Sequence, residues 1–562
     1  PMGSEIMARI ISEDEDLIMP PSGDHLSKEE IDVLGKWIQQ GAKWKSPQNS
    51  LTLDVPASAD DYTFIRRVYF DSVGIPPTPE VIRSFVDDQD PQKREKMIDT
   101  LLSKDEVVDN WMGEWLDFLA ENPTLLNQSL NSTGPFRWFL YESFIDRKPL
   151  DRIVTELILM RGDSARGGSA GFGQAAENDA PLAAKAHILA SSFLGVEMQC
   201  ARCHDAPYHS SKQRDLFSLS AMLERKPVKV PASSRVPASF FEHKGRKSLI
   251  EVTLKPNETI SPTWSLKEFI DPTEATSLEH LLENKQDSRE RLATLVTSHE
   301  NKRFAKVIVN RIWKRLMGAG IVEPAHDWEG NEPSHPELLD WLASEFMEMG
   351  WSVKSILKLI LVSDSFKQTS VPRPDALKID AGSRYLWRFP PRRLEAEAIR
   401  DSILSVSGNL NLEMGGPGFY LLDVDRENVV HYHPKEKISS KEWRRMVYMF
   451  KIRQEQDLIF GAFDCPDGNQ VIPERSRSTT PIQALNLFNS HFMIEQSGIM
   501  AKSLITEAGP SIRAQIKAAY NRYYGRPATD DEVKDASAFV SEHSLSDFCR
   551  AMFNSNEFLF TF

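Results

Sequence analysis

The sequence predicts a mainly α, multidomain helical protein with a small β-rich insert between its helical domains. Apolar residues recur at helical spacing through most of the 562 residues, and glycine or proline closes many of these runs. Between 226 and 262, the segments KPVKVPASSRV and KSLIEVTLKP instead carry Val, Ile and Pro with partial alternation, which is typical of short strands. A chain of this length is too long for one ordinary core, so we expect several domains.

The first helices are predicted from the residues at their boundaries. A helix over 5–19 ends near IMPPSG, because two consecutive prolines cannot continue it. The next helix begins at a capping box formed by Ser27 and Glu30. Beyond a polar linker, a helix that stops at Gly74 is followed by one that Thr78 caps. These boundary signals place the first helices without any knowledge of the fold.

The later helices follow from periodicity. They are predicted over 93–120, 134–160, 181–200, 303–320, 336–350, 392–406, 440–455, 481–504 and 511–525. The helix in PSHPELLDWLASEF is expected to take Ser334 as its cap and Glu337 as its capping-box partner. The Gly- and Ser-rich residues 161–180 are expected to form a mobile surface loop, since no preceding strand supports a phosphate-binding loop.

One helical corner occurs twice. IRRVYFDSVGIPPTPEV (65–81) and IKAAYNRYYGRPATDDEV (516–533) share Ile, Tyr, Gly, Pro and Thr at one constant offset. Both predict a helix, a glycine stop, a proline, a threonine cap and a second helix. A repeated helical hairpin and the common chemistry of helix corners both account for this pattern.

Charge and composition exclude some classes of protein. The net charge of −14 argues against broad binding of nucleic acid or of anionic membranes, which need a basic surface. No apolar run is long enough to span a bilayer. No signal peptide is visible, and the chain opens on PMGSEIMARI without an initiator Met, so we expect a leader and a first segment to precede residue 1. Four cysteines cannot provide a disulfide framework for a chain of this size, and Cys465 and Cys549 are expected to be buried free thiols.

The strongest chemical motif is MQCARCHDAPYH. Cys200, Cys203 and His204 form Cys-x-x-Cys-His, which provides two thiols for covalent haem attachment and an imidazole for the iron. Zinc would need a second pair of ligands, and the other two cysteines are single and remote. A thioredoxin-like dithiol would need a βαβ context, whereas this motif follows a helical run. We therefore favour a c-type haem over zinc or thiol chemistry.

The sixth position of this iron is open in the sequence. His209 is close to the motif, which makes it a poor candidate for the opposite haem face. The other candidates are His187, Met222, His326 and His335, each of which has an ordinary alternative as a surface, core or cap residue. An open sixth position would favour ligand binding or catalysis, whereas His or Met there would favour electron transfer.

Several long motifs stand in order along nearly the whole chain. They are MARIISEDEDLIMPPSGDHLSKEEIDVLGKWIQQGAKW, then FIRRVYFDSVGIPPTPEVIRSFV through FLGVEMQCARCHDAPYH, and finally VNRIWKRLMGAGIVEP, PSHPELLDWLASEF, RRLEAEAIRDSILSVSG, RSTTPIQALNLFNS and NSNEFLF. Together they resemble the planctomycete-type multidomain cytochrome c and surface-domain proteins. The first motif resembles the end of that family's leading cytochrome c domain, the second stretch resembles its CxxCH-bearing domain, and the last five resemble its C-terminal planctomycete surface domain.

This resemblance implies a domain organisation and a set of ligands. The domains would be 1–48 (the C-terminal part of a cytochrome c-like domain), 56–225 (the helical haem c domain), 226–287 (the β-rich insert or linker) and 288–562 (the surface domain). Cys200 and Cys203 would bear one haem and His204 would be its proximal ligand. Met19 would be the distal ligand of a first haem, whose CxxCH is absent from this chain. Ala206 replaces a histidine that many family members carry, so no role of that histidine transfers.

Three other groups of residues are given mainly structural interpretations. Arg392, Arg393, Glu395, Glu397, Arg475 and Arg477 could bind an anion, but ion pairs inside a helical domain are favoured. Trp111, Trp115, Trp313, Trp328 and Trp341 could stack on sugars, but core positions are favoured. His431 and His433 near Asp423 and Asp425 could bind a metal, but a solvated loop is favoured.

Three functions follow from these features. The first is an exported c-type haem protein in extracytoplasmic electron transfer, with a redox partner protein or another haem domain. The second is a haem-dependent oxidoreductase on an extracellular substrate such as a carbohydrate, and the third is a cell-surface structural or assembly protein. Covalent haem is attached outside the cytoplasmic membrane, so the first two place the protein in the periplasm or at the cell surface. The sequence names no reaction, leaves enzymatic activity undecided and allows an oligomer.

Overall fold

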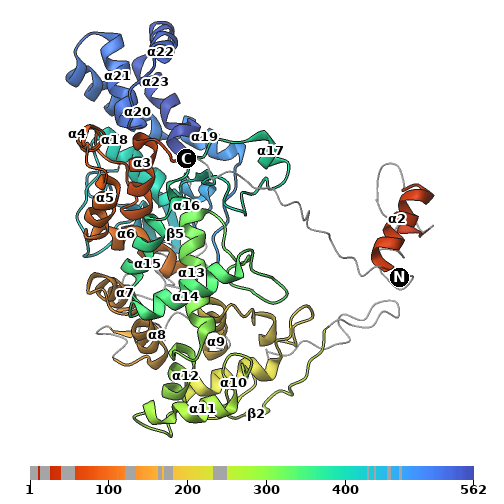
Figure 1. Cartoon of the computed structure of the whole chain (residues 1–562). Coiled ribbons are helices and arrows are strands. Elements are labelled where there is room, and N and C mark those ends of the chain that lie inside the picture. The colour runs from red at the N-terminus through yellow and green to blue at the C-terminus, as the bar shows by residue number, and fades with distance from the viewer. Residues whose placement is uncertain are drawn as a thin grey trace. The chain divides into compact units, whose positions relative to one another are not determined.

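The fold is mainly α, as the sequence predicts. A computed structural model of the protein describes residues 10–12, 26–39, 57–119, 135–162, 168–169, 172, 181–231, 250–426, 430–435, 438–451, 457, 459–466 and 471–562 (Figure 1). The chain divides into two compact units, of which one comprises residues 1–55 and 373–381 and the other the remainder. Among the described helices, none has the length and apolar composition to cross a bilayer.

The smaller unit contains α2 (Lys28–Gln39) and α17 (Pro374–Leu377). The predicted capping box at the start of α2 is present, because the Ser27 backbone N–H donates to Glu30 Oε2 at 2.8 Å and the Glu30 N–H donates to Ser27 Oγ at 3.3 Å. Most of the helix expected over 5–19 lies outside the described residues, and so does Met19.

Within its described residues, the larger unit begins with eight α-helices that lead to the CxxCH motif and past it. They are α3 (Asp61–Ser72), α4 (Pro79–Asp87), α5 (Lys93–Leu102), α6 (Glu106–Leu119), α7 (Pro135–Ile145), α8 (Leu150–Leu159), α9 (Pro181–Leu189) and α10 (Gln213–Glu224). A π-helical turn over Ala190–Leu194 extends α9. The run expected over 134–160 is two helices, because Arg147 has a positive φ and Pro149 precedes α8.

The insert region contains few strands among its described residues. β1 (Val228–Lys229) pairs antiparallel with β2 (Thr259–Ile260), and α11 (Pro272–Ser277) and α12 (Ser288–Thr297) follow. Further along come α13 (Lys302–Met317), α14 (Pro336–Glu348), α15 (Val353–Leu361) and α16 (Asp364–Lys367). The expected cap of α14 was wrong by one residue. His335 is the N-cap, and Ser334 Oγ instead donates to the carbonyl of Ile321 at 3.2 Å.

The last part of the chain combines helices with two short strand pairs. Its elements are β3 (Arg392–Arg393), α18 (Ala396–Ser407), β4 (Leu422–Arg426), β5 (Val430–Pro434), α19 (Pro481–Asn489), α20 (His491–Ala508), α21 (Ile512–Tyr523), α22 (Asp530–Glu542), α23 (Leu545–Phe553), α24 (Asn556–Leu559) and β6 (Phe560–Thr561). The helix expected over 481–504 is interrupted at Ser490. β3 pairs antiparallel with β6, which brings the last residues of the chain onto α3.

Two expectations in this part were wrong. The segment DVDRENVVHYHP, interpreted as a solvated loop, instead contributes the paired strands β4 and β5, in which Asp423 pairs with His433 and Asp425 with His431, although these four side chains are exposed as expected. The described residues of 440–455, where a helix was expected, form no α-helix. They contain only a short 3-10 turn over Met446–Tyr448. The N–H of Met446 donates to Asp401 Oδ1 at 2.8 Å, so a tertiary contact replaces the bond that a helix would make.

Two hydrophobic cores hold the larger unit together. One core extends from Phe64 to Phe389 and includes residues of α3–α10 and of α12–α16. The second consists mainly of residues from Leu394 to Leu559, with Phe70 of α3 packed into it. In Figure 1, α8, α9, α10 and α12 form one group of packed helices, and α20–α23 form another. The boundary between the two cores therefore falls just before α18. The residues before 226 and those directly after 287 belong to the same first core.

Aromatic residues mostly occupy these cores. Trp111, Trp115, Trp313 and Trp328 are buried as predicted, whereas Trp341 is 48% exposed on α14. Most of residues 161–180 lie outside the described part, but Phe172 is fully buried with its ring centroid 5.9 Å from that of Phe136. At least one residue of the expected surface loop is therefore part of the core.

The two similar corners have the same local structure. Gly74 and Gly525 both have positive φ values, +76° and +73°, and each follows a helix. Thr78 and Thr529 then cap α4 and α22, each by accepting a hydrogen bond from the third residue of the helix. This likeness confirms the corner chemistry that the sequence predicts at both places.

Candidate functional site

The CxxCH motif begins where a tight turn ends the α9 run. Gly195 has a φ of +62°, and a Cβ on it would lie 2.8 Å from Trp328 Cδ1, so only glycine fits between the chain and this indole. The N–H of Trp328 also donates to the Gly195 carbonyl at 3.0 Å. Trp328 thus fixes the point at which the chain leaves the helix and enters the motif.

The motif itself is one helical turn. Cys200–Arg202 form a 3-10 turn in which the Cys203 N–H donates to the Cys200 carbonyl at 3.1 Å. The N–H of His204 donates to the same carbonyl at 3.2 Å. Ala201 is fully buried, whereas Cys200 is exposed and Cys203 and His204 are half-buried. The turn is anchored by its second residue and leaves both thiols and the imidazole accessible.

A buried carboxylate holds the chain that follows. Asp205 Oδ1 accepts from the Gln213 N–H at 2.9 Å and from Thr253 Oγ1 at 2.9 Å. The Asp205 N–H donates to the carbonyl of Glu251 at 2.8 Å. These bonds connect the motif to the first turn of α10 and to the insert, so the backbone beside His204 is fixed on both sides.

The hydrogen bond of His204 defines which ring nitrogen is available. His204 Nδ1 lies 2.8 Å from its neighbour's carbonyl, that of Asp205. A carbonyl oxygen can only accept, so Nδ1 carries the proton and Nε2 keeps its lone pair. Metal-binding histidines usually have this arrangement, in which the second nitrogen donates to a backbone carbonyl. Within the described residues, Nε2 has no hydrogen bond that competes with a metal.

The two thiols suit covalent attachment better than thiolate chemistry. Both are free cysteines. Partial burial, the carboxylate of Glu197 and the neighbouring Cys203 raise the pKa of the Cys200 thiol. A redox dithiol works through a thiol whose pKa is lowered, so this environment weighs against that alternative. No group of three or more His, Cys, Asp or Glu side chains within the described ranges is arranged to hold a metal ion, so zinc gains no further ligands there.

The chemistry of this donor set fits a c-type haem. Two accessible thiols can form thioethers, and an oriented Nε2 can meet the iron from one face. Cys200, Cys203 and His204 are the residues that would hold the group.

Each candidate for the sixth position has a contact of its own. His187 Nδ1 accepts from the Met198 N–H at 3.3 Å. His209 Nε2 lies 2.7 Å from Asp327 Oδ2, His326 Nδ1 lies 3.3 Å from Glu474 Oε2, and His335 Nδ1 lies 3.0 Å from Ser334 Oγ. Met222 is buried within α10. The described residues therefore single out none of these side chains as a distal ligand.

The arginine and glutamate group is a buried ion network, as the structural interpretation predicts. Arg475 Nε donates to Asp117 Oδ2 at 2.7 Å, and its Nη atoms reach Glu397 at 2.9 Å and Glu395 at 3.1 Å. Burial would raise the pKa of Glu395, but the guanidinium groups of Arg315 and Arg475 outweigh it and lower that pKa to about 2. Asp117 belongs to α6, and Arg475 lies between Cys465 and Leu487 of the second core, so the network joins the two halves of the larger unit.

Sequence reasoning missed one feature, a cavity of about 790 Å³ beside the β4–β5 hairpin and the start of α20. Its lining residues are scattered between Leu421 and Glu495 in six short segments. No spacing rule connects such segments, so only their packing in the fold reveals the cavity.

Two family models match the chain. Residues 45–227 match PSCyt2, a protein of unknown function (DUF1549), and residues 288–540 match PSD1, a protein of unknown function (DUF1553). These are the planctomycete cytochrome c-associated domains, which confirms the resemblance at the level of these two domains, and neither match shows a haem-binding domain. No curated protein and no solved structure matches the chain.

Proposed function

We propose that this protein is an exported c-type haem protein that acts in extracytoplasmic electron transfer. The observation that carries the proposal is the CxxCH turn, in which two accessible thiols lie beside an imidazole whose Nδ1 is fixed on the Asp205 carbonyl. The presence of two planctomycete cytochrome c-associated domains supports it.

In this proposal the chain's own residues attach and orient the group. The thiols of Cys200 and Cys203 would form the covalent links, and His204 Nε2 would hold the iron. The Nδ1–H bond to the Asp205 carbonyl keeps the imidazole in the tautomer that can ligate and raises its basicity. When bound, haem supplies reversible one-electron chemistry at iron. The electron would pass to a redox partner protein or to another haem domain.

Localisation follows from the attachment chemistry. Covalent c-type haem is assembled outside the cytoplasmic membrane, so the protein would be exported to the periplasm or the cell surface. A first haem with Met19 as its distal ligand stays a prediction, since that residue lies outside the described ranges.

Spectroscopy of the exported holoprotein tests the electron-transfer role. We expect a low-spin, six-coordinate iron that cycles between ferric and ferrous states and does not bind carbon monoxide or cyanide. An iron that binds these ligands readily would favour the oxidoreductase instead. A large assembly without redox activity would favour a structural role.

Variants connect this signal to the motif. His204→Ala should lose the native low-spin spectrum, whereas His280→Ala, at an exposed histidine on a 3-10 turn, should keep it. An unchanged spectrum in His204→Ala would contradict the proposed ligand.

A further inference from the structure

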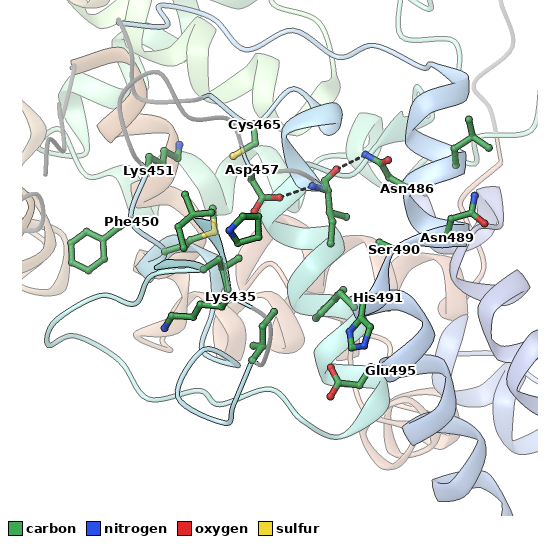
Figure 2. A pocket seen from close by; sticks show the side chains of 18 of the residues that line it. Lys435, Phe450, Lys451, Asp457, Cys465, Asn486, Asn489, Ser490, His491 and Glu495 are labelled. Carbon is green, nitrogen blue, oxygen red and sulfur yellow. Dashed lines mark hydrogen bonds between the residues drawn. The ribbon is translucent and has the colours of Figure 1, made fainter. Parts of the chain in front are cut away.

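The cavity beside the β4–β5 hairpin has the size of a small-molecule site. Its volume is about 790 Å³, within the range of about 300–1,000 Å³ that ligand pockets occupy. It lies between the end of the hairpin, the segment Met449–Lys451 and the junction of α19 with α20 (Figure 2). It is remote in sequence from the CxxCH motif and plays no part in the proposed haem site.

One wall of the cavity is apolar and rigid. Leu421, Met449, Phe450 and Phe492 contribute to it, and Met449 and Phe492 are nearly fully buried. The Phe450 ring stacks on Tyr420, with centroids 3.9 Å apart and an interplanar angle of 10°. A preformed apolar wall with a fixed aromatic ring favours a ligand with a flat or aliphatic body.

The start of α20, which also contributes Phe492, offers hydrogen-bond donors. Ser490 separates α19 from α20, and Ser490, His491 and Phe492 all line the cavity. The 18-residue helix α20 begins at His491, and its first backbone N–H groups have no acceptor within the helix. Ser490 makes no capping bond to them, and its buried Oγ has no hydrogen-bond partner among the described residues. A buried hydroxyl without a partner is costly, and rotation of the Ser490 side chain toward the cavity would let an acceptor on a ligand relieve it.

The charged residues of the lining are mostly compensated by the protein. Lys435 Nζ lies 2.8 Å from Glu442 Oε1, and Lys451 Nζ lies 2.6 Å from Asp117 Oδ1. Asp457 Oδ1 accepts from the backbone N–H groups of Ile459 and Phe460.

The last charge is Glu495, which lies one turn further along α20, below His491 in Figure 2. The N-terminal turn of α20, which precedes Glu495 along the helix, presents backbone N–H donors and a partial positive charge to the cavity.

We propose that this cavity binds a small organic acid, with its carboxylate or sulfonate at Ser490 and the first turn of α20 and its apolar body against Phe450 and Phe492. The head accepts from the Ser490 hydroxyl and the free N–H groups, and the body replaces water on the apolar wall. The ligand class is thus defined by one anionic end and one apolar end.

Two fluorescent probes with the same rings test the ligand class. 8-Anilinonaphthalene-1-sulfonate carries an anionic head, and N-phenyl-1-naphthylamine lacks it. We expect the sulfonate to bind the full chain at least about tenfold more tightly, because hydrogen bonds to a charged acceptor are stronger than the apolar contact alone. Octanoate should displace it and octanol should displace it less well. Equal binding of both probes would overturn the anionic head, and no binding would overturn the site.

A matched pair of variants places the probe in the cavity. Leu485 and Ile482 are both exposed on α19, by 58% and 60%, but only Leu485 lines the cavity. Leu485→Trp should weaken sulfonate binding at least about fivefold by narrowing the cavity, whereas Ile482→Trp should leave it unchanged. Equal effects would mean that the probe binds the outer face of α19 and would overturn the proposal.

Ser490→Ala tests the position of the head. We expect about fivefold weaker binding of the sulfonate and unchanged binding of the neutral probe, because only the anionic head uses the hydroxyl. If Ser490→Ala weakens both probes equally, or neither, the head does not lie at α20. Far-ultraviolet circular dichroism of each variant confirms that the fold is retained.

Discussion

Replacing Arg475 by methionine should destabilise the protein severely, because three acidic side chains share this guanidinium. Arg475 is 9% exposed, and Asp117 and Glu397 are 6% and 17% exposed. In the variant, Asp117 keeps Lys451 at 2.6 Å, and Glu395 keeps Arg315 at 3.9 Å. Glu397 loses its hydrogen-bonded partner, so one buried carboxylate is left without direct compensation.

The expected loss follows from that one uncompensated charge. Removing one partner of a buried ion pair costs about 3–5 kcal/mol. Arg475→Lys keeps the charge but not the forked geometry, so we expect a smaller loss of about 1–2 kcal/mol. In the double variant Arg475→Met with Glu397→Gln, no charged carboxylate is stranded, and about half of the stability should return.

The pH dependence has a definite sign. In the native protein, burial would raise the pKa of Glu397, but the guanidinium of Arg475 outweighs burial and lowers this pKa. The ionised Glu397 therefore stabilises the fold above the ordinary pKa of a glutamate, and this stabilisation is lost as the pH falls. In Arg475→Met, burial without the guanidinium should raise this pKa instead. The difference in unfolding free energy between the native protein and Arg475→Met should therefore be largest near neutral pH and should shrink as the pH falls below about 5.

Urea denaturation followed by circular dichroism measures these differences. A loss below about 1 kcal/mol for Arg475→Met at pH 7 would refute the reasoning, because such a value is typical of an exposed ion pair. A deficit that grows as the pH falls would also refute it.

Three further predictions rest on local geometry. Gly525→Ala should cost about 1–3 kcal/mol in denaturation, because φ is +73° and the new Cβ would lie 2.8 Å from Ile82 Cδ1; Gly408→Ala, which is also left-handed with φ +84° but whose new Cβ would meet its nearest atom only at 3.9 Å, should cost less. In the haem-free native polypeptide, alkylation at pH 8 should modify the two motif cysteines, whereas Cys465 and Cys549, whose pKa values burial raises to about 12, should react only after unfolding, as counted by mass spectrometry. Burial would raise the pKa of Glu474, but hydrogen bonds and neighbouring cations outweigh burial and lower this pKa to about 2. Glu474→Gln should therefore reduce the loss of stability that the native protein shows between about pH 5 and pH 2. An unchanged acid denaturation profile would contradict a stabilising role of this carboxylate.

Short-range signals predicted much of the helical architecture. The corners at Gly74 and Gly525 were predictable because a positive φ and a threonine cap are determined by a few adjacent residues. The CxxCH turn was predictable for the same reason, since its three side chains lie within one turn.

Contacts between distant residues were not predictable. Arg475 was expected to make ion pairs, but its strongest partner is Asp117 on α6, which no local pattern connects to it. The segment around Met446 has a helical pattern, yet a bond to Asp401 and burial in the second core hold it in another conformation. The cavity was missed because packing, and not spacing, brings its walls together.

The most direct test of the central claim is the intact mass of the exported protein, with a pyridine haemochrome spectrum of the same sample. Co-production with a cytochrome c maturation system should give the mass of the polypeptide plus one haem and the spectrum of a haem held by two thioethers. The double variant Cys200→Ser with Cys203→Ser should lose both signals, and Cys465→Ser should keep them. A mass equal to that of the bare polypeptide would contradict the proposed haem site.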